Sequence, residues 1–522
     1  MPNPFFYGDP VPHDKFLGRQ RELRRIVSRL SNRGQSTAIV GEPRSGKTSL
    51  LLYLSAPEMR TALYGTEGER RLIFSYLDAH TLGMEFTPVQ FWEQALQPLY
   101  EQLVVSTHDT ELSQLYAACH DTGYNSFALE RLFNQLETTD KRLVLLLDEF
   151  DLILHHPRLN SAEFFGSLRS LASRSRGTLA LIIAGRFPLG RLNTDTQQLS
   201  RTGSPYFNFL SEVTLGPLAQ REALLLLNQG LERFSSADIH FITVLAGGHP
   251  YLLQVAACEL WEIYEDEPES AQGCRRQVAE LLYSEVALTL ADTWRLWPPE
   301  MRCAFTAVAL QHLNALVPPG MNHNTTPNEI SLTDTYTSYE IGLHALLATV
   351  GRNHPDALIY EQRLMENIAH CRRFFDDDTR KSERAQIIAQ LNTLAVALTG
   401  NSFNALCERE NPQPLHIAVR VLHEVMRDFR QELQLLERQG FVCEDAIIPG
   451  GWAVRPLAFL WWLADEIVHE VRDKPTLEAW MRAQRWDGLL THAERAALGQ
   501  ALRAVDLALE SGAKMLIAAA AS

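Results

Sequence analysis

The sequence lacks the features of a disulfide-bonded, zinc-binding or membrane-spanning protein. Its seven cysteines are scattered and none are spaced as C-x-x-C, which favours reduced thiols in a cytoplasmic protein. No window reaches the apolar length that a membrane span needs, and the first residues have neither the basic nor the apolar region of a signal peptide. We therefore expect a soluble cytoplasmic protein that makes no membrane contact.

The sequence also has fewer basic than acidic residues. The chain has 48 Lys and Arg against 63 Asp and Glu, a formal net charge of −15. Proteins that bind nucleic acid without sequence preference are usually basic, so duplex binding is disfavoured, although a local basic face could still exist. The 522 residues, 46% of them hydrophobic, allow about three or four domains with cores of their own.

One stretch carries a specific motif. Residues 41–48, Gly-Glu-Pro-Arg-Ser-Gly-Lys-Thr, match G-x-x-x-x-G-K-[ST] between an apolar strand at 36–40 and a helical pattern. Glycines let backbone N–H groups point at a phosphate, and the following helix adds the positive end of its dipole. We expect Lys47 to reach the β- and γ-phosphates and the Thr48 hydroxyl to coordinate Mg²⁺. The candidate nucleotide contacts here are Gly41, Glu42, Pro43, Arg44, Ser45, Gly46, Lys47, Thr48 and Ser49. A glycine-rich turn with a surface lysine is the competing interpretation.

Acidic residues end a second apolar run, at residues 142–151. A run without alternation is typical of a central parallel strand, and ligands bind at the carboxyl ends of such strands. We expect Asp148 to hold Mg²⁺ and Glu149 to polarise the attacking water. A further strand at 179–186 ends at Arg186, a candidate sensor of the γ-phosphate. The competing interpretations are a polar loop for the acids and a surface ion pair for Arg186.

The fold expected for residues 16–215 is a doubly wound α/β domain with a parallel sheet, of the P-loop NTPase type. A strand at 71–78 lies in the sequence between the P-loop strand and the acidic strand. This fits the P-loop class in which an additional strand separates those two in the sheet. The order of the strands cannot be read from the sequence.

Beyond residue 215 the patterns become helical. The expected parts are an extended N-terminal segment packed against something (1–15), the α/β domain (16–215), a helical lid (216–290), a winged-helix-like domain (291–314 and 430–468), a helical insertion (315–429) and a C-terminal helical tail (469–522). The winged-helix interpretation rests on the order helix, helix, Gly-containing hairpin. Without a concentrated basic face, this domain suits a structural or switching role. The insertion is either a docking module or a decoration.

Several segments in this order resemble the STAND NTPases, signalling ATPases related to the AAA+ and origin-recognition-type families. They are residues 16–19 with Glu22, the P-loop, 147–149, 184–186 and 247–250. The resemblance implies ATP and Mg²⁺ as cofactors, a role in signalling or defence, and nucleotide contacts from Arg19 and Pro250. Gln20 departs from the pattern, because an acid is common at that position. No tetratricopeptide, propeller, ankyrin or leucine-rich repeat is present as a sensor.

The sequence leaves the functional class open among three hypotheses. The first is an ATP-binding and slowly hydrolysing switch that recruits a separate effector chain through the insertion or tail, with nucleotide-dependent homo-oligomers as an option. The second is a DNA-binding AAA+ ATPase of the origin-recognition or helicase-loader type. The third is a scaffold in which bound ATP is structural and is not hydrolysed.

Overall fold

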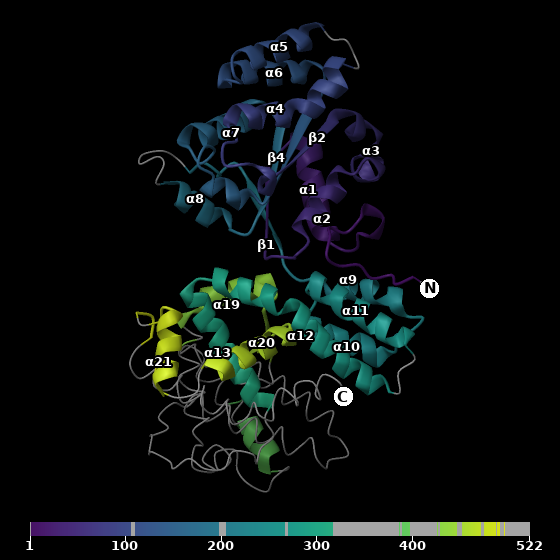
Figure 1. The fold of residues 1–522 in the computed structure, drawn as a ribbon, viewed down its shortest axis with the longest axis vertical. Coiled ribbons are helices and arrows are strands. Elements are labelled where there is room, and N and C mark those ends of the chain that lie inside the picture. Colours follow the sequence, from purple (N-terminus) through teal and green to yellow (C-terminus); the bar gives the residue numbers. More distant parts are fainter. Residues whose placement is uncertain are drawn as a thin grey trace. The chain divides into compact units, whose positions relative to one another are not determined.

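The computed structural model describes residues 2–105, 110–197, 205–266, 270–316, 386, 389–396, 425, 428–445, 451–470, 474–486, 488–490 and 495. The chain divides into two compact units (Figure 1). The first comprises Met1–Ser235 and Gly248–Glu262, and the second comprises Ser236–Gly247 and Ile263–Ser522. Among the residues so described, no helix is long and apolar enough to cross a membrane.

A parallel sheet of five strands forms the centre of the first unit, in the order β2-β3-β4-β1-β5. The strands are β1 (Thr37–Gly41), β2 (Leu72–Asp78), β3 (Arg142–Asp148), β4 (Leu179–Gly185) and β5 (Ser211–Leu215). Every residue of β1, β3 and β4 is buried, because helices cover both faces of the sheet. The predicted doubly wound α/β fold is confirmed.

The helices between residues 20 and 197 form a layer on each side of the sheet (Figure 1). They are α1 (Gln20–Arg33), α2 (Lys47–Ser55), α3 (Arg60–Arg71), α4 (Pro88–Leu99), α5 (Thr110–Asp121), α6 (Ser126–Thr138), α7 (Ala162–Arg174) and α8 (Leu189–Gln197). Successive strand residues point to opposite faces. Accordingly Ile39 joins the core made with α1, α2 and α3, whereas Ala38 and Val40 join the core made with α4 to α8.

The sheet has a strand between β1 and β3, as the expected P-loop class requires. This strand is β4, whereas β2, which comes between them in the sequence, lies at the edge. The strand β5 lies within the predicted domain but has no apolar run to reveal it. As an edge strand it is only partly buried, so Ser211, Glu212 and Thr214 are tolerated there.

Short helical turns connect these elements. The 3₁₀ turns are η1 (His13–Lys15), η2 (Pro57–Met59), η3 (Ala79–Thr81), η5 (Phe150–His155) and η6 (Asn228–Gly230), and η4 (Tyr100–Val105) is a π-helical segment that continues α4. The turn η5 follows directly on β3 and its acidic end, so it contributes to the site described below.

Helices dominate the rest of the described chain, as predicted. They are α9 (Gln220–Leu227), α10 (Ser236–Ala246), α11 (Pro250–Glu265), α12 (Ala271–Leu296), α13 (Pro299–Leu316), α19 (Arg430–Gln439), α20 (Leu457–Glu470) and α21 (Lys474–Ala483). The antiparallel hairpin of β6 (Val442–Glu444) and β7 (Trp452–Val454) follows α19. The described chain thus contains α13, α19 and this hairpin in that order, and the winged-helix-like domain stays a prediction.

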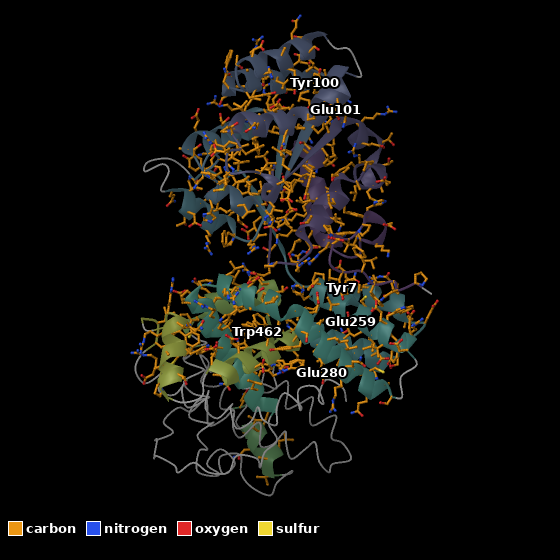
Figure 2. All side chains as sticks on the ribbon, in the orientation of Figure 1. Tyr7, Tyr100, Glu101, Glu259, Glu280 and Trp462 are labelled. Atoms are coloured by element: carbon orange, nitrogen blue, oxygen red, sulfur yellow. The ribbon has the colours of Figure 1, made fainter. Side chains whose placement is uncertain are left out.

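Aromatic side chains hold the second unit together. The Trp297 ring lies 4.9 Å from that of Phe441 and 5.2 Å from that of Phe459, and Trp462 packs beside Phe459 at 5.4 Å (Figure 2). His312 is buried in α13, and its Nδ1 accepts a hydrogen bond of 3.0 Å from the backbone N–H of Val454 in β7. These contacts join α13, the segment between α19 and β6, the strand β7 and α20 in one core.

Most of the predicted insertion, residues 315–429, and the tail beyond 495 lie outside the described residues. Residues 389–396 are helical, with Leu391 and Ala395 buried, in agreement with the apolar spacing there. The first part of the predicted tail includes α21, and Trp486 after it donates a hydrogen bond of 3.1 Å from Nε1 to the carbonyl oxygen of Pro299.

Candidate nucleotide-binding site

The P-loop connects β1 to α2 through a tight turn. A Cβ on Gly41 would lie only 2.5 Å from the Ser45 Oγ, so this close approach requires glycine. Arg44 and Gly46 have left-handed backbones, with φ of 61° and 91°. The Ser45 Oγ is buried and has no hydrogen-bond partner in the described structure. Because an unpaired buried hydroxyl is costly, its presence fits a loop built around a polar ligand.

Lys47 begins α2 with its ammonium inside the loop. Its side chain is buried, and Nζ donates hydrogen bonds to the carbonyl oxygens of Gly41 (3.0 Å) and Glu42 (3.1 Å). Burial lowers the pKa of Lys47, and the nearby carboxylate of Glu149 acts in the opposite direction. A cation surrounded by loop atoms and balanced by an acid is suited to binding phosphate oxygens.

The acidic end of β3 lies next to this lysine. Asp148 is buried, with Oδ2 accepting from the Tyr76 hydroxyl and Oδ1 from the Glu149 backbone N–H, both at 3.0 Å. Glu149 itself has a left-handed backbone with φ of 47°. Within the described residues no three His, Cys, Asp or Glu side chains converge on one point. Asp148 and Thr48 nevertheless fit Mg²⁺, which takes a few hard oxygen ligands from protein and the rest from phosphate and water.

Asp151 is a site residue that sequence reasoning missed. Its carboxylate, in η5, accepts hydrogen bonds from the backbone N–H of Arg186 and from that of Phe187, the latter at 3.4 Å. Gly185 makes room for it, since a Cβ there would lie 2.8 Å from the carboxylate oxygens. Burial raises the pKa of Asp151. The only signal for this role in the sequence is that the run at 142–151 contains a third acid.

Arg19 reaches the P-loop from the start of α1. It is buried, its φ is 59°, and its Nη2 donates a 3.0 Å hydrogen bond to the carbonyl oxygen of Ser45. Burial lowers the pKa of Arg19. Glu222 of α9 accepts a 3.2 Å hydrogen bond from the backbone N–H of Gln20, which holds the first turn of α1 in place.

A cavity of about 350 Å³ brings the predicted residues together. Its lining includes Arg19, Pro43, Arg44, Ser45, Gly46, Lys47, Thr48, Ser49, Glu149, Arg186 and Pro250. Gly41, Glu42 and Asp148 lie directly behind this wall and contact it through Lys47, Ser45 and Glu149. Phe16, in the segment 16–19 singled out by the resemblance, also lines the cavity, and so do residues 6–11, Tyr251 and Gln254, none of which is a predicted site residue.

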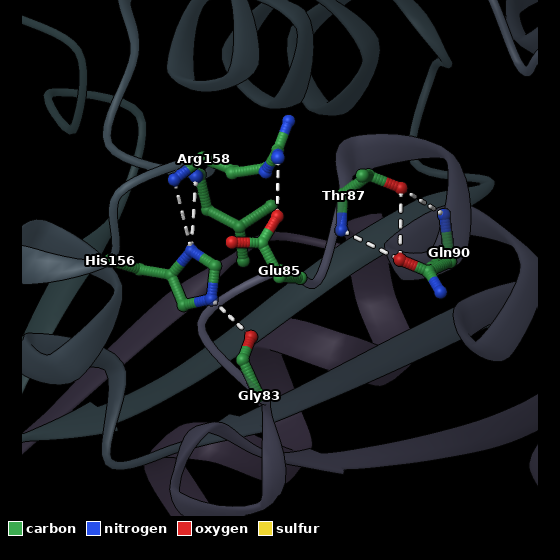
Figure 3. A network of polar contacts seen from close by, with 7 residues as sticks. Gly83, Glu85, Thr87, Gln90, His156 and Arg158 are labelled. Carbon is green, nitrogen blue, oxygen red and sulfur yellow. Dashed lines mark hydrogen bonds and ion pairs between the residues drawn. The ribbon is translucent and has the colours of Figure 1, made fainter.

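A separate polar network ties two loops of the same sheet edge together (Figure 3). His156, just after η5, contacts the Gly83 carbonyl oxygen through Nε2 at 2.9 Å, and its Nδ1 accepts from the backbone N–H groups of Arg158 and Leu159. Because Nδ1 is an acceptor, Nε2 carries the ring proton. The loop after β2 is thereby joined to the segment that carries Asp151.

The fold is that of P-loop NTPases. Residues 30–189 match the family described as "AAA domain", so this part of the chain is similar to AAA-type P-loop NTPases, a nucleotide-binding class. The match covers the P-loop, β3 and β4 but not α9 to α21.

Solved structures of low similarity accompany this match. The Walker-type ATPase of Pyrococcus abyssi is 15% identical, with 88% of this chain and 99% of that chain covered and a TM-score of 0.41. The Aeropyrum pernix ORC2 protein with ADPNP and ADP is 12% identical (86% and 95% covered, TM-score 0.38). A Pyrococcus horikoshii STAND protein with a tetratricopeptide repeat sensor is 13% identical (92% and 66% covered, TM-score 0.29). No curated protein matches the chain.

Proposed function

We propose that this protein is an ATP-binding and ATP-hydrolysing molecular switch. One observation carries the proposal: a single cavity is lined by the P-loop, by Glu149 after β3, by Arg186 after β4 and by Pro250 at the start of α11. The first three elements supply groups for phosphate chemistry. The fourth belongs to a helix outside the sheet and can respond to what the cavity holds.

Each residue has a distinct role in this proposal. Lys47 binds the β- and γ-phosphates, and the oxygens of Thr48 and Asp148 hold Mg²⁺, which neutralises charge on the phosphates when bound. Glu149 orients the attacking water and accepts its proton. Arg186, positioned through Asp151, contacts the terminal phosphate and distinguishes triphosphate from diphosphate.

Switching requires contacts that differ between the two nucleotide states, because a ligand shifts an equilibrium only through such differences. Arg186 would lose its partner when the γ-phosphate leaves. Pro250 begins α11, which continues to Glu265, and residues from Ile263 onward belong to the second unit. We infer that the nucleotide state acts on the second unit through α11. We further propose that the lid, the winged-helix-like part and the insertion predicted from the sequence serve to recruit a partner.

The DNA-binding alternative is disfavoured by the charges of the winged-helix-like part. Helix α19 carries Arg430 and Arg438 but also Glu432 and Glu437, and the hairpin adds the exposed Glu444. Phosphate binding requires a surplus of positive charge on the contacting face. A DNA-binding titration at low and high salt tests this alternative, and salt-sensitive binding at low salt would restore it.

The main test compares Lys47→Ala and Glu149→Gln with the wild-type chain. Lys47→Ala should abolish nucleotide binding, whereas Glu149→Gln should retain ATP and reduce hydrolysis by about 100-fold. Lys141→Ala is the control, because Lys141 directly precedes β3 at the end away from Asp148 and donates to the Arg70 carbonyl oxygen. Native mass measured with ADP and with ATP reports assembly. Normal binding and turnover in both site variants would refute the proposal, and tight ATP retention without turnover in the wild type would favour a scaffold.

A further inference from the structure

The N-terminal strap, which we define as residues 3–11, is anchored at one end to α11. The Asn3 Nδ2 donates to the Cys258 carbonyl oxygen at 3.3 Å, and the Phe6 backbone N–H donates to Gln254 Oε1 at 3.1 Å. The Tyr7 hydroxyl donates to Glu259 Oε1 at 2.8 Å (Figure 2). These hydrogen bonds make the strap part of the wall that α11 contributes to the cavity.

An aromatic anchor supports the same end. Phe5 is 4% exposed, and its ring stacks on Phe234 with centroids 5.4 Å apart. Its edge meets Trp261 of α11 at 6.4 Å. A buried aromatic ring with two aromatic neighbours resists displacement more than exposed hydrogen bonds do. The strap is therefore fastened to α11 whether or not its other end is held.

The other end of the strap is held by the P-loop itself. The Arg44 Nη1 donates a 2.7 Å hydrogen bond to the Gly8 carbonyl oxygen, and the Val11 backbone N–H donates at 3.0 Å to Ser49 Oγ. The Arg44 guanidinium also lies 5.1 Å from the ring centroid of Tyr251, within cation–π range. Arg44 thus contacts the strap and α11 at the same time.

These contacts assign Arg44 a different task from the other P-loop side chains. Lys47 turns inward to the carbonyls of the loop, whereas the exposed Arg44 side chain is committed to Gly8 and Tyr251. We propose that Arg44 is a positioning residue that locks the strap and α11 onto the phosphate cradle and so sets the rate at which nucleotide leaves. This inference rests on the nucleotide binding proposed above.

Residues 6–11 line the cavity together with the P-loop, and the Arg44 contacts are expected to slow the release of nucleotide. A nucleotide on the P-loop shares its cavity with the strap, so widening the cavity on that side requires the Arg44 contacts to break. Phosphate cleavage depends instead on Lys47, Thr48 and Glu149. Loss of the lock should consequently change dissociation much more than cleavage.

The experiment measures displacement of a fluorescent N-methylanthraniloyl-ATP from the full chain by excess ATP, together with single-turnover hydrolysis. Arg44→Ala should release nucleotide about 10-fold faster, a typical effect of losing a charged hydrogen bond and a cation–π contact. Arg44→Lys should restore most of the retention, since an ammonium can still face Tyr251 and donate to Gly8. Arg158→Ala removes an exposed arginine elsewhere and is the control.

Two further variants test the other contacts of the strap and of Arg44. Val11→Pro removes the N–H that donates to Ser49 Oγ, in a segment already flanked by Pro10 and Pro12, and should also speed release. Tyr251→Leu combined with Arg44→Ala should add little to Arg44→Ala alone if the two side chains act together.

The outcomes separate this inference from the proposed function. Unchanged dissociation in Arg44→Ala and Val11→Pro, with binding still abolished by Lys47→Ala, would overturn the lock alone. An equal loss of single-turnover rate and retention in Arg44→Ala would make Arg44 a phosphate contact, which also overturns it. Failure of the wild-type chain to bind nucleotide would refute the proposed function itself.

Discussion

Tyr76 donates a hydrogen bond of 3.0 Å from its hydroxyl to Oδ2 of Asp148. The contact connects the edge strand β2 to the acid at the end of β3, and Tyr76 remains 38% exposed. Burial and the charge of Asp148 both raise the pKa of Tyr76, so its hydroxyl stays a donor. Since Oδ1 is held by the Glu149 N–H, the orientation of the whole carboxylate is set.

The substitution Tyr76→Phe is expected to weaken the binding of Mg²⁺ at Asp148. Groups that orient a metal ligand typically change metal affinity by 10-fold or more when removed. We expect the Mg²⁺ concentration for half-maximal ATP hydrolysis to rise by about 10-fold. Tyr64→Phe is the matched control, because its hydroxyl donates to the Leu54 carbonyl oxygen away from the site. A Mg²⁺ titration that is the same for both variants would contradict this role.

Asp151→Asn should disturb Arg186, because it weakens the hydrogen bonds that hold the backbone there. An amide offers one oxygen to the two backbone N–H groups, and its NH₂ would face the other donor. We expect ATP turnover to fall by about 10-fold, because an unsatisfied buried donor costs about 1–3 kcal/mol. Asp195→Asn alters an exposed ion pair with Arg191 and serves as the control. Turnover equal in the two variants would show that Asp151 does not position Arg186.

The parts of the site that could be predicted are those marked by local pattern. Residues 41–48 have a spacing that phosphate binding imposes, and β3 and β4 show continuous apolar runs because both faces are covered. The strap could not be predicted, since Phe6 and Tyr7 pair with Gln254 and Glu259 far along the chain. Residues 1–15 were expected only to pack against something.

The strand order and the strand β5 could not be predicted from the sequence for a different reason. The position of β4 between β1 and β3 depends on which way the connecting helices cross the sheet, and no residue pattern records this. The strand β5 has polar residues at three of its five positions, so its sequence resembles that of a surface loop. The role of Asp151 could not be predicted for the same reason. Its hydrogen-bond donors lie in the loop after β4, and the sequence does not show that this loop folds against it.

His312 should make stability depend on pH. Burial lowers the pKa of its imidazole from 6.5 to about 4 in the folded chain. Between these values the unfolded chain binds a proton that the folded chain does not, so stability is full above pH 6.5 and is lost as the pH falls toward 4. The loss is about 3 kcal/mol at most, from about 1.4 kcal/mol per pKa unit.

The measurement is the free energy of unfolding by denaturant at several pH values. His312→Asn keeps an acceptor for the Val454 N–H but does not titrate, so its free energy of unfolding should fall less over this range. Because both chains contain every other titrating group, the difference between them isolates His312. Parallel pH profiles would contradict the assignment.

The native backbone conformation at position 149 should be less favourable for glutamate than for glycine. Its φ of 47° is left-handed, which costs a residue with a Cβ about 1–2 kcal/mol. We therefore expect Glu149→Gly to unfold at higher denaturant than Glu149→Ala, with both inactive in hydrolysis. Asp148→Gly against Asp148→Ala, at a strand position, should show the opposite order.

Arg19, Arg44 and Glu149 share this left-handed geometry, with φ of 59°, 61° and 47°, and all line the cavity. A selection for heat resistance alone would thus find some of its improvements at the proposed nucleotide site, alongside Tyr124, Asp140, Arg176 and Arg485, which share the geometry but do not line the cavity. Thermostabilised variants of this chain should therefore be screened for turnover at every round, because substitutions that ease folding at these three positions would also remove side chains proposed to contact nucleotide.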